Sequence, residues 1–387
     1  MSRPAGVALA AIVARAVELR RDLHRHPELM YREERTAAVV RAELDALGIA
    51  WRACAGTGTV ARLGPAAGRH IALRADLDAL PLSEATGLPW SSAHPGVMHA
   101  CGHDGHTATL IGAAAWLKAR EAALPGPVTL VFQPAEEGGH GARKMIEGGA
   151  LDGVDEIYGY HNWPPIPFGY AAAPAGPVMA ANGEWRATIV GRGGHAAQPH
   201  LCVDPVVAGA NFVQLAQQVV SRQVAPHLAA VVTVTCFHAG TADNIIPDSA
   251  ELVGTVRAAT TGLRDDLARR TEAALHAACA PSGARGSFAY APCYPAAVND
   301  ARCAATAAAA LARVIGPDRL VHDGLPLMAA EDFAYYLQER PGCFILLGAG
   351  RPGETMEPCH SPRFDFNDEL VPVVVRLWAD LAGVPVG

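Results

Sequence analysis

Short apolar runs and helical stretches alternate along the first part of the chain. Residues 71–77 (IALRADL), 128–132 (VTLVF) and 156–160 (EIYGY) are apolar runs of strand length, so they predict buried strands. A long Ala- and Leu-rich stretch at 107–123 and a shorter stretch at 141–147 lie between them and predict helices. This alternation is typical of an α/β layer built on a mainly parallel sheet.

The pattern changes in the middle of the chain. Half-buried strands and long helices are predicted there in the order strand 184–190, helix 205–222, strands 230–237 and 250–258, helix 261–280 and strand 287–290. This β-α-β-β-α-β order is that of a split ferredoxin-like unit. The earlier alternation then resumes, with a helix at 302–315 and a strand at 344–347. The sequence therefore predicts a mixed, mainly parallel α/β domain over 1–181 and 296–387, interrupted by a ferredoxin-like α+β domain over 182–295.

Composition favours a soluble protein that acts on small molecules. Of the 387 residues, 50% are hydrophobic and 18% are charged, which excludes a disordered chain. The net charge of −7 gives no basic surface for nucleic acid or anionic lipid, and no apolar run reaches the ~18 residues of a membrane span. The 9 cysteines form no Cys-x-x-Cys motif, so we expect free thiols and a cytoplasmic location.

Four segments carry residues able to bind a metal ion. Residues 99–106 (HACGHDGH) place Cys and His one glycine apart before a predicted helix, a spacing that suits zinc or a similar ion. Residues 133–139 (QPAEEGG) directly follow a predicted strand. Neighbouring side chains there point in different directions, so one carboxylate can bind an ion while the other acts as a general base. The remaining two segments hold His161, at the end of a strand, and His360.

These segments are distant in sequence, but the carboxyl ends of strands in an open α/β sheet meet at one crevice. Joint ligation is therefore expected. Nitrogen, oxygen and sulfur donors sufficient for two ions are offered by Cys101, His103, Glu137, His161 and His360. A non-catalytic metal-binding protein is an alternative, disfavoured because Glu136 remains free of ligand duty.

Ten motifs run in order through nearly the whole chain: HRHPEL (24–29), RADLDALP (74–81), MHACGHDGHTA (98–108), FQPAEEGG (132–139), GYHNWP (159–164), GRGGHAAQPH (191–200), NIIPD (244–248), GTVR (254–257), EDFAYY (331–336) and HSPRFDFND (360–368). As a set they are highly specific. The chain resembles the aminoacylase/hippurate hydrolase/carboxypeptidase family of co-catalytic metallohydrolases, particularly its branch of bacterial hippurate hydrolases and plant indoleacetyl-amino-acid hydrolases. The resemblance implies a metal-binding catalytic domain and an inserted lid and dimerisation domain.

The resemblance also implies roles for individual residues. The positions that bind the metals in that branch match Cys101, His103, Glu137, His161 and His360. Glu136 matches the general base or acid, and Asp78 matches an aspartate that orients a ligand. His195 matches a residue that reaches the active site of a neighbouring subunit and stabilises the oxyanion. Asn244 and Arg257 match residues that hold the α-carboxylate of the substrate.

The expected activity is that of a metal-dependent amidohydrolase, which cleaves hippurate-like N-acyl amino acids to a carboxylate and a free amino acid. A metal-dependent dipeptidase or carboxypeptidase with the same site chemistry is the alternative. We expect two divalent ions per subunit, zinc or manganese, with cobalt or nickel left open. The expected partners are a small-molecule substrate and a second copy of the chain, with neither nucleic acid nor membrane.

Overall fold

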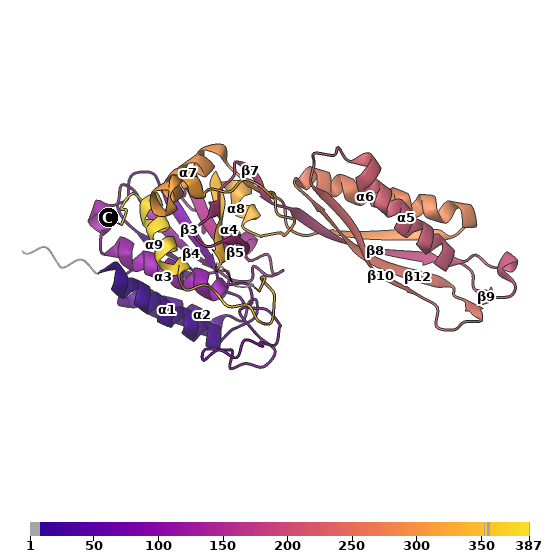
Figure 1. The fold of residues 1–387 in the computed structure, drawn as a ribbon, viewed down its shortest axis with the longest axis horizontal. Coiled ribbons are helices and arrows are strands. Elements are labelled where there is room, and N and C mark those ends of the chain that lie inside the picture. Colours follow the sequence, from indigo (N-terminus) through magenta and orange to yellow (C-terminus); the bar gives the residue numbers. More distant parts are fainter. Residues whose placement is uncertain (1–7, 352, 354–356, 387) are drawn as a thin grey trace, which may run out of the picture. The chain divides into compact units, whose positions relative to one another are not determined.

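The computed structural model describes residues 8–351, 353 and 357–386, so the first seven residues of the predicted catalytic domain lie outside the described residues. The chain divides into two compact units (Figure 1). The first unit comprises Met1–Gly176, Val298–Asp323 and Asp332–Gly387, and the second comprises Pro177–Ala297 and Gly324–Glu331. Among the described residues, no helix combines the length and hydrophobicity needed to span a bilayer.

The first unit is built on a mixed sheet. Its strands are β1 (Trp51–Cys54), β2 (Gly58–Leu63), β3 (Ile71–Asp76), β4 (Val128–Gln133), β5 (Glu156–Pro167), β6 (Ala171–Ala172) and β15 (Gly342–Gly350). Within the described residues these seven strands lie in the order β1-β2-β4-β3-β5-β15-β6. The central strands β4, β3, β5 and β15 are parallel, whereas β1, β2 and β6 pair antiparallel. Every residue of β3, β4 and β15 is buried, as in parallel strands covered on both faces. The predicted α/β class is confirmed.

Helices flank this sheet. They are α1 (Leu9–Arg25), α2 (Glu34–Ala46), α3 (His103–Lys118), α4 (Gly141–Glu147), α7 (Ala301–Ile315), α8 (Ala334–Glu339) and α9 (Leu370–Leu381). Helix α3 is buried along nearly its whole length because it packs against α1, α9 and the sheet. Short 3₁₀ turns lie at Glu121–Ala123, Pro199–Leu201, Ala280–Ser282 and Pro317–Arg319. The buried position of α3 matters for the site, since the helix begins within the predicted metal-binding segment.

The second unit is an antiparallel sheet with two helices. Its elements are β8 (Ala181–Val190), β9 (Gly194–His195), α5 (Pro205–Gln223), β10 (Ala230–Ala239), β11 (Ile245–Ile246), β12 (Ser249–Ala258), α6 (Thr261–Cys279) and β13 (Arg285–Pro292). The main strands lie in the order β10-β12-β8-β13, and β9 pairs with β11. The order β8-α5-β10-β12-α6-β13 along the chain is the split ferredoxin-like pattern. Two further short strands of the chain are β7 (Gly176–Met179) and β14 (Ala297–Asn299).

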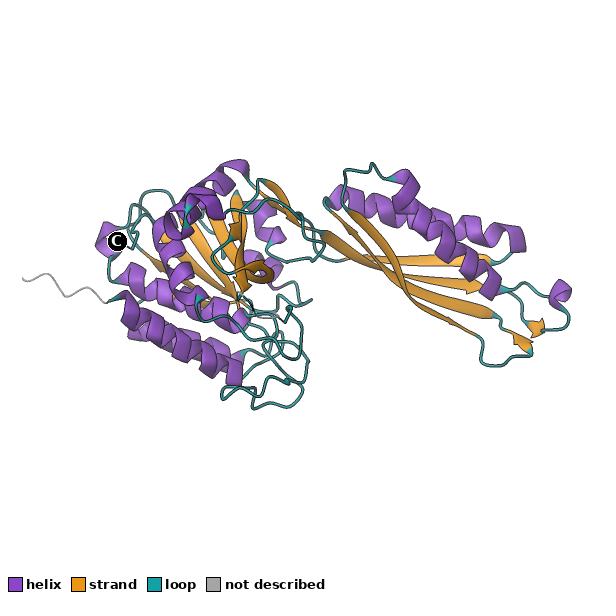
Figure 2. Ribbon diagram, viewed as in Figure 1, coloured by secondary structure: helices purple, strands orange, loops and turns teal. Residues whose placement is uncertain are grey.

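The core of the second unit follows from alternation along β8. Trp185, Ala187 and Ile189 are buried in one cluster with residues of α5 and α6, whereas the residues between them are more exposed. Both helices lie on one face of the sheet (Figure 2). Asp204 caps α5 by accepting hydrogen bonds from backbone N–H groups, and Pro205 is the first helical residue. Asp at the cap and Pro at the first helical position are both favourable for starting a helix.

Candidate metal centre

The loop before α3 carries two of the predicted ligands. Cys101 and His103 flank Gly102, which has φ of 101°, a conformation that glycine adopts without strain. A Cβ on Gly102 would lie 2.1 Å from Asn162 Oδ1, so glycine also permits a close approach to β5. The helix begins at His103 instead of the predicted residue 107. The helix starts four residues earlier than predicted because His103 and the residues after it form the first turn of α3.

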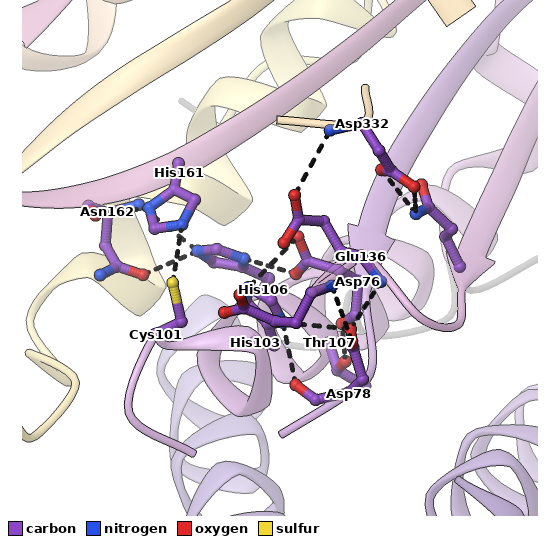
Figure 3. A network of polar contacts seen from close by, with 12 residues as sticks. Asp76, Asp78, Cys101, His103, His106, Thr107, Glu136, His161, Asn162 and Asp332 are labelled. Atoms are coloured by element: carbon purple, nitrogen blue, oxygen red, sulfur yellow. Dashed lines mark hydrogen bonds and ion pairs between the residues drawn. The ribbon is translucent and has the colours of Figure 1, made fainter. Parts of the chain in front are cut away.

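Cys101, His103 and His161 lie close together in the first unit, with Glu136 nearby (Figure 3). Glu137 and His360 belong to the same cluster. Among the groups whose donor atoms all lie within 4.8 Å of one another, three contain at least two predicted ligands: Cys101, His103 and His161; Cys101, Glu137 and His360; His103, Glu136 and Glu137. Cys101 Sγ lies 3.2 Å from His161 Nε2, and Glu137 Oε1 lies 3.2 Å from His360 Nε2. The structure therefore brings four distant segments of the chain into one cluster of sulfur, nitrogen and oxygen donors.

The histidine rings in this cluster are oriented through their far nitrogens. His103 Nδ1 donates to the backbone oxygen of Asp78 at 2.9 Å, and His161 Nδ1 donates to the backbone oxygen of Asn162 at 2.7 Å. Each Nε2 then faces the cluster, which is the arrangement that metal-binding histidines usually have. Burial lowers the pKa of His103, but the charges of Asp76 and Asp78 outweigh burial and raise it to about 10. Burial keeps the pKa of His161 well below its ordinary value.

A buried nitrogen supports the fit to a cation. His103 Nε2 has no hydrogen-bond partner among the described residues, since the Asp76 carboxylate lies 3.7 Å away. A buried polar atom left without a partner costs about 1–3 kcal/mol, unless a ligand satisfies it. Thiolate, imidazole and carboxylate are together the donors that zinc-like ions take. The residues present therefore fit a divalent metal.

Asp78 holds the loop that carries both glutamates. Its carboxylate oxygens accept hydrogen bonds from the backbone N–H of Glu136 at 3.0 Å and of Glu137 at 2.9 Å. Ala135, just before them, has a positive φ of 55°, which turns the chain sharply after β4. Glu137 reaches the His360 ring, whereas Glu136 Oε1 accepts a hydrogen bond from the Asp332 N–H at 3.3 Å. The two adjacent carboxylates thus have different surroundings.

A buried network behind the cluster was not predicted from the sequence. The ring of His106 joins Asp76 Oδ1, 2.6 Å from Nδ1, to Asn162 Oδ1, 2.7 Å from Nε2. Burial raises the pKa of Asp76, but Arg74 and the neighbouring histidines outweigh it and hold that pKa well below its usual range. Asp332 accepts two hydrogen bonds from the Gln133 amide, at 2.8 and 2.9 Å. The sequence offered a clue to the role of Asp76, because this acidic residue is the last of strand β3 and stands two residues before Asp78. Asp332 lies in the motif EDFAYY, but the motif does not indicate its contact, since its partner Gln133 is 199 residues away.

His195 and Asn244 lie next to each other in the second unit. The Ala196 N–H donates to the backbone oxygen of Asn244 at 3.0 Å. The His195 side chain is exposed, and its Nδ1 accepts a hydrogen bond from the Ala197 N–H at 3.0 Å. In the neutral ring the proton is therefore on Nε2, where it can be donated to a ligand.

Arg257 lies at the opposite end of the same sheet. It pairs with Asn182 across β12 and β8, whereas Ser249 pairs with Val190 at the end that leads to β9. Eight residues of strand separate the two ends, which is about 27 Å at ~3.4 Å per residue. The Arg257 guanidinium donates to the backbone oxygen of Met328 at 2.8 Å. Within one copy of the second unit, Arg257 and the pair of His195 and Asn244 therefore cannot contact the same small molecule.

Comparison with known proteins agrees with this geometry. The model of Peptidase family M20/M25/M40 matches residues 72–383. The IAA-amino acid hydrolase ILR1-like 4 of Arabidopsis thaliana is 39% identical over 372 residues, covering 95% of this chain and 84% of the relative. The N-acetylcysteine deacetylase of Bacillus subtilis (strain 168) is 39% identical over 375 residues, covering 96% and 97%.

Solved structures share the whole fold. The Bacillus subtilis YXEP protein, described as a dinuclear metal binding peptidase from the M20 family, superposes with a TM-score of 0.84 at 36% identity, covering 96% of this chain and 98% of the other. A putative aminohydrolase from methicillin-resistant Staphylococcus aureus gives a TM-score of 0.87 at 33% identity, covering 96% and 97%. The resemblance inferred from the motifs is confirmed. This chain belongs to the peptidase family M20/M25/M40.

Proposed function

We propose that this protein is a metal-dependent amidohydrolase that cleaves N-acyl amino acids to a carboxylate and a free amino acid. The observation that carries the proposal is the donor cluster, with Glu136 beside the five predicted ligands. Relatives named as an IAA-amino acid hydrolase and an N-acetylcysteine deacetylase support an acylated amino acid as substrate. Peptide hydrolysis is the competing activity, because another relative, 34% identical, is named thermostable carboxypeptidase 1.

We infer that each subunit holds two divalent ions through Cys101, His103, Glu137, His161 and His360. Two of the three donor groups share Cys101 and together contain all five residues, which supports two adjacent ions. Zinc or manganese fits this mixed donor set, and cobalt or nickel is a further option. When bound, the ions supply Lewis-acid chemistry that makes water acidic enough to yield hydroxide near neutral pH.

Glu136 is the proposed general base and acid. It takes a proton from the attacking water and later delivers the proton to the leaving amine. The Asp332 N–H holds one of its carboxylate oxygens, and Asp78 fixes the backbone that carries it. These contacts limit the positions that the carboxylate can occupy, as proton transfer requires.

The substrate-binding roles proposed for the second unit require two copies of the chain. His195 donates its Nε2–H to the oxyanion, while the Asn244 amide and the Arg257 guanidinium hold the α-carboxylate. Because Arg257 lies about 27 Å from the end that carries the other two side chains, one site needs Arg257 from one subunit and His195 with Asn244 from another. We therefore propose a homodimer.

An uncovered strand edge supports this assembly. Among the described residues, β10 pairs on one side only, with β12, so its other edge offers free backbone groups. Large apolar side chains are exposed at Phe237 on β10 and at Val206 and Val207 on α5. All nine cysteines lie within the described residues and are free thiols, which supports the proposed cytoplasmic location.

Chelation followed by metal restoration tests the proposed activity. The chelated protein should lose hydrolysis of benzoyl-, acetyl- and long-chain-acyl amino acids, and one or more of zinc, manganese, cobalt and nickel should restore it. The same panel includes dipeptides with a free amine, which a peptidase would prefer. Full activity after thorough chelation, with no metal detected, would overturn the proposal.

A further inference from the structure

Two cysteines from distant parts of the chain meet at the candidate metal centre. Cys101 lies in the loop before α3, and Cys359 directly precedes His360. The His360 N–H donates to the backbone oxygen of Ala100 at 2.7 Å, so the two segments run side by side. Cys359 Sγ lies 3.9 Å from the backbone oxygen of Cys101, so this thiol lies against the residue that carries the other one.

Both sulfurs lie against neighbouring residues of β5. Cys101 Sγ is 3.2 Å from His161 Nε2 and Cys359 Sγ contacts Asn162, so side-chain rotations can bring the sulfurs toward the bond length of about 2.05 Å. Asn162 packs against the Cys359 thiol, with both its side-chain nitrogen and its backbone oxygen 3.9 Å from Sγ. Cys101 is 7% exposed, whereas Cys359 is half-buried and more accessible. Cys359 has no role in the proposed hydrolysis, so this pairing needs another explanation.

We propose that Cys101 and Cys359 form a peroxide-sensitive thiol pair, which oxidation converts into a disulfide that removes Cys101 from the metal donors. The disulfide itself follows from the position of the Cys359 thiol against Cys101. The loss of a metal donor rests on the proposed ligand role of Cys101.

The chemistry balances with hydrogen peroxide as the oxidant. The more accessible Cys359 sulfur attacks one peroxide oxygen, the O–O bond breaks, and a sulfenic acid and one water form. The Cys101 sulfur then attacks the Cys359 sulfur, the S–O bond breaks, and a second water leaves. The two thiols lose two protons and two electrons, and one peroxide is reduced to two waters.

The effect on the centre follows from the place of Cys101 within it. A disulfide sulfur carries no negative charge and no longer supplies a thiolate to an ion. Cys101 belongs to both donor groups that together hold the five predicted ligands, so its loss weakens both. Reduction by a thiol restores the donor. The pair therefore couples the oxidation state of the protein to its metal content.

Peptide mapping and metal release test the two halves of the proposal separately. The metal-loaded protein and the chelated protein are treated with hydrogen peroxide and digested without reductant. Mass spectrometry should find a peptide pair linked through Cys101 and Cys359, lighter by two hydrogens than the reduced peptides, in both preparations. A chromogenic chelator should detect released metal from the loaded protein, and dithiothreitol followed by added metal should restore its original content.

Matched variants make the result specific. Cys359→Ser and Cys359→Ala should form no link at Cys101 and should retain metal at peroxide doses that strip the wild type. Cys202→Ser, which removes a partly exposed thiol from the second unit, should behave as the wild type does. Oxidation of Cys101 without the link, or equal metal loss in the Cys359 variants, would overturn the proposal. If the protein forms the link but keeps all its metal, the proposal that oxidation removes Cys101 from the metal donors is wrong. The proposed amidase activity is tested separately, by the chelation experiment.

Discussion

Adjacent glutamates receive different environments because neighbouring side chains leave the backbone in different directions. Glu137 reaches the ring of His360, and Glu136 meets the backbone of Asp332. Asp78 makes this division rigid, since each of its carboxylate oxygens accepts one backbone N–H of the pair. The local arrangement separates a side chain suited to binding an ion from one suited to moving a proton.

The substitution Glu136→Gln tests this division of roles. Glutamine keeps the size and the acceptor oxygen but cannot take a proton, so kcat should fall by about 10²–10⁴-fold, toward the upper end because the residue also positions the water. Metal content and unfolding midpoint should stay at wild-type values. Glu147→Gln, on the exposed face of α4, should leave kcat unchanged. A Glu136→Gln enzyme that keeps more than about a tenth of wild-type turnover would show that another group is the base.

His24 supplies a prediction on stability. Its ring is buried, with Nδ1 2.9 Å from Asp104 Oδ2 and Nε2 3.4 Å from Glu84 Oε1. Burial and the charge of Arg20 lower the pKa of His24, but the two carboxylates outweigh them and raise it to about 9. The folded protein binds this proton more tightly than the unfolded chain, whose histidine titrates near 6.5. The contribution to stability is therefore fully present below about pH 6.5 and is lost as pH rises through about 9.

Replacing His24 by Gln should lower the free energy of unfolding at pH 6, by about 3 kcal/mol at most. The difference between variant and wild type should shrink between pH 6 and pH 10, because the wild-type ring loses its charge over that interval. Urea unfolding of both proteins at several pH values measures this difference. The exposed His276→Gln serves as control and should show no such trend. A constant difference across this pH range would mean that His24 is not charged in the folded protein.

The sequence located the candidate ligands because each one stands in a short motif. Cys101 and His103 flank one glycine, and Glu137 follows a strand of strong apolar pattern. The supporting residue Asp332 also stands in a motif, EDFAYY, but that motif does not indicate its partner. Asp332 contacts Gln133 across 199 residues of sequence, and such a pairing depends on how α8 and β4 are brought together. Local pattern carries no information about that distance, so this part of the network was not predicted.

At the scale of elements, the central strands were predicted and the outer strands were missed. Strands β3, β4 and β15 are buried at every residue, so their sequences are continuous apolar runs. Strand β1 is exposed at three of its four residues and so lacks such a run, while β6 has only two residues. Strand β5 continues to Pro167, beyond the predicted end at residue 160, because its backbone keeps pairing with β15 despite its prolines.

The start of α3 gives a prediction at this scale. Gly102→Ala places a methyl group at φ of 101° and 2.1 Å from Asn162 Oδ1, between two predicted ligands. Gly48→Ala is the matched control, since Gly48 has φ of 65° and no atom lies within 4 Å of the position that an added Cβ would take. Backbone strain should cost both variants about 1–3 kcal/mol. Only Gly102→Ala should also weaken metal binding, as measured by metal content after dialysis. Equal metal content in the two variants would contradict the proposed packing of this turn against Asn162.

At the scale of the whole molecule, the second unit separates residues that one substrate would need together. The β-α-β-β-α-β order was readable from the sequence because its strands alternate and its helices are long. The separation of Arg257 from His195 and Asn244 could not be predicted, because sequence motifs do not show at which end of the sheet each residue lies. Asn244 precedes the end of β12 that pairs with Val190, whereas Arg257 lies at the end that pairs with Asn182. The proposed dimer follows from that register. It is therefore tested by asking whether two subunits together form one active site.

Complementation between two inactive variants provides this test. His195→Ala leaves Glu136 intact, and Glu136→Gln leaves His195 intact. If His195 serves the site of the other subunit, a mixed dimer has one complete site and one that lacks both groups. Co-expression in equal amounts makes half of the dimers mixed, so about a quarter of wild-type activity should return.

Co-expression is needed because mixing purified dimers gives recovery only if subunits exchange, and differently tagged chains allow the mixed dimer to be isolated. If His195 acts within its own chain, each chain of the mixed dimer lacks one essential group and no activity returns. Confirmed mixed dimers without activity would therefore exclude the proposed role across the interface. Full activity of a monomer at high dilution, checked by analytical ultracentrifugation, would contradict it as directly, because a single copy cannot bring Arg257 and His195 to one substrate.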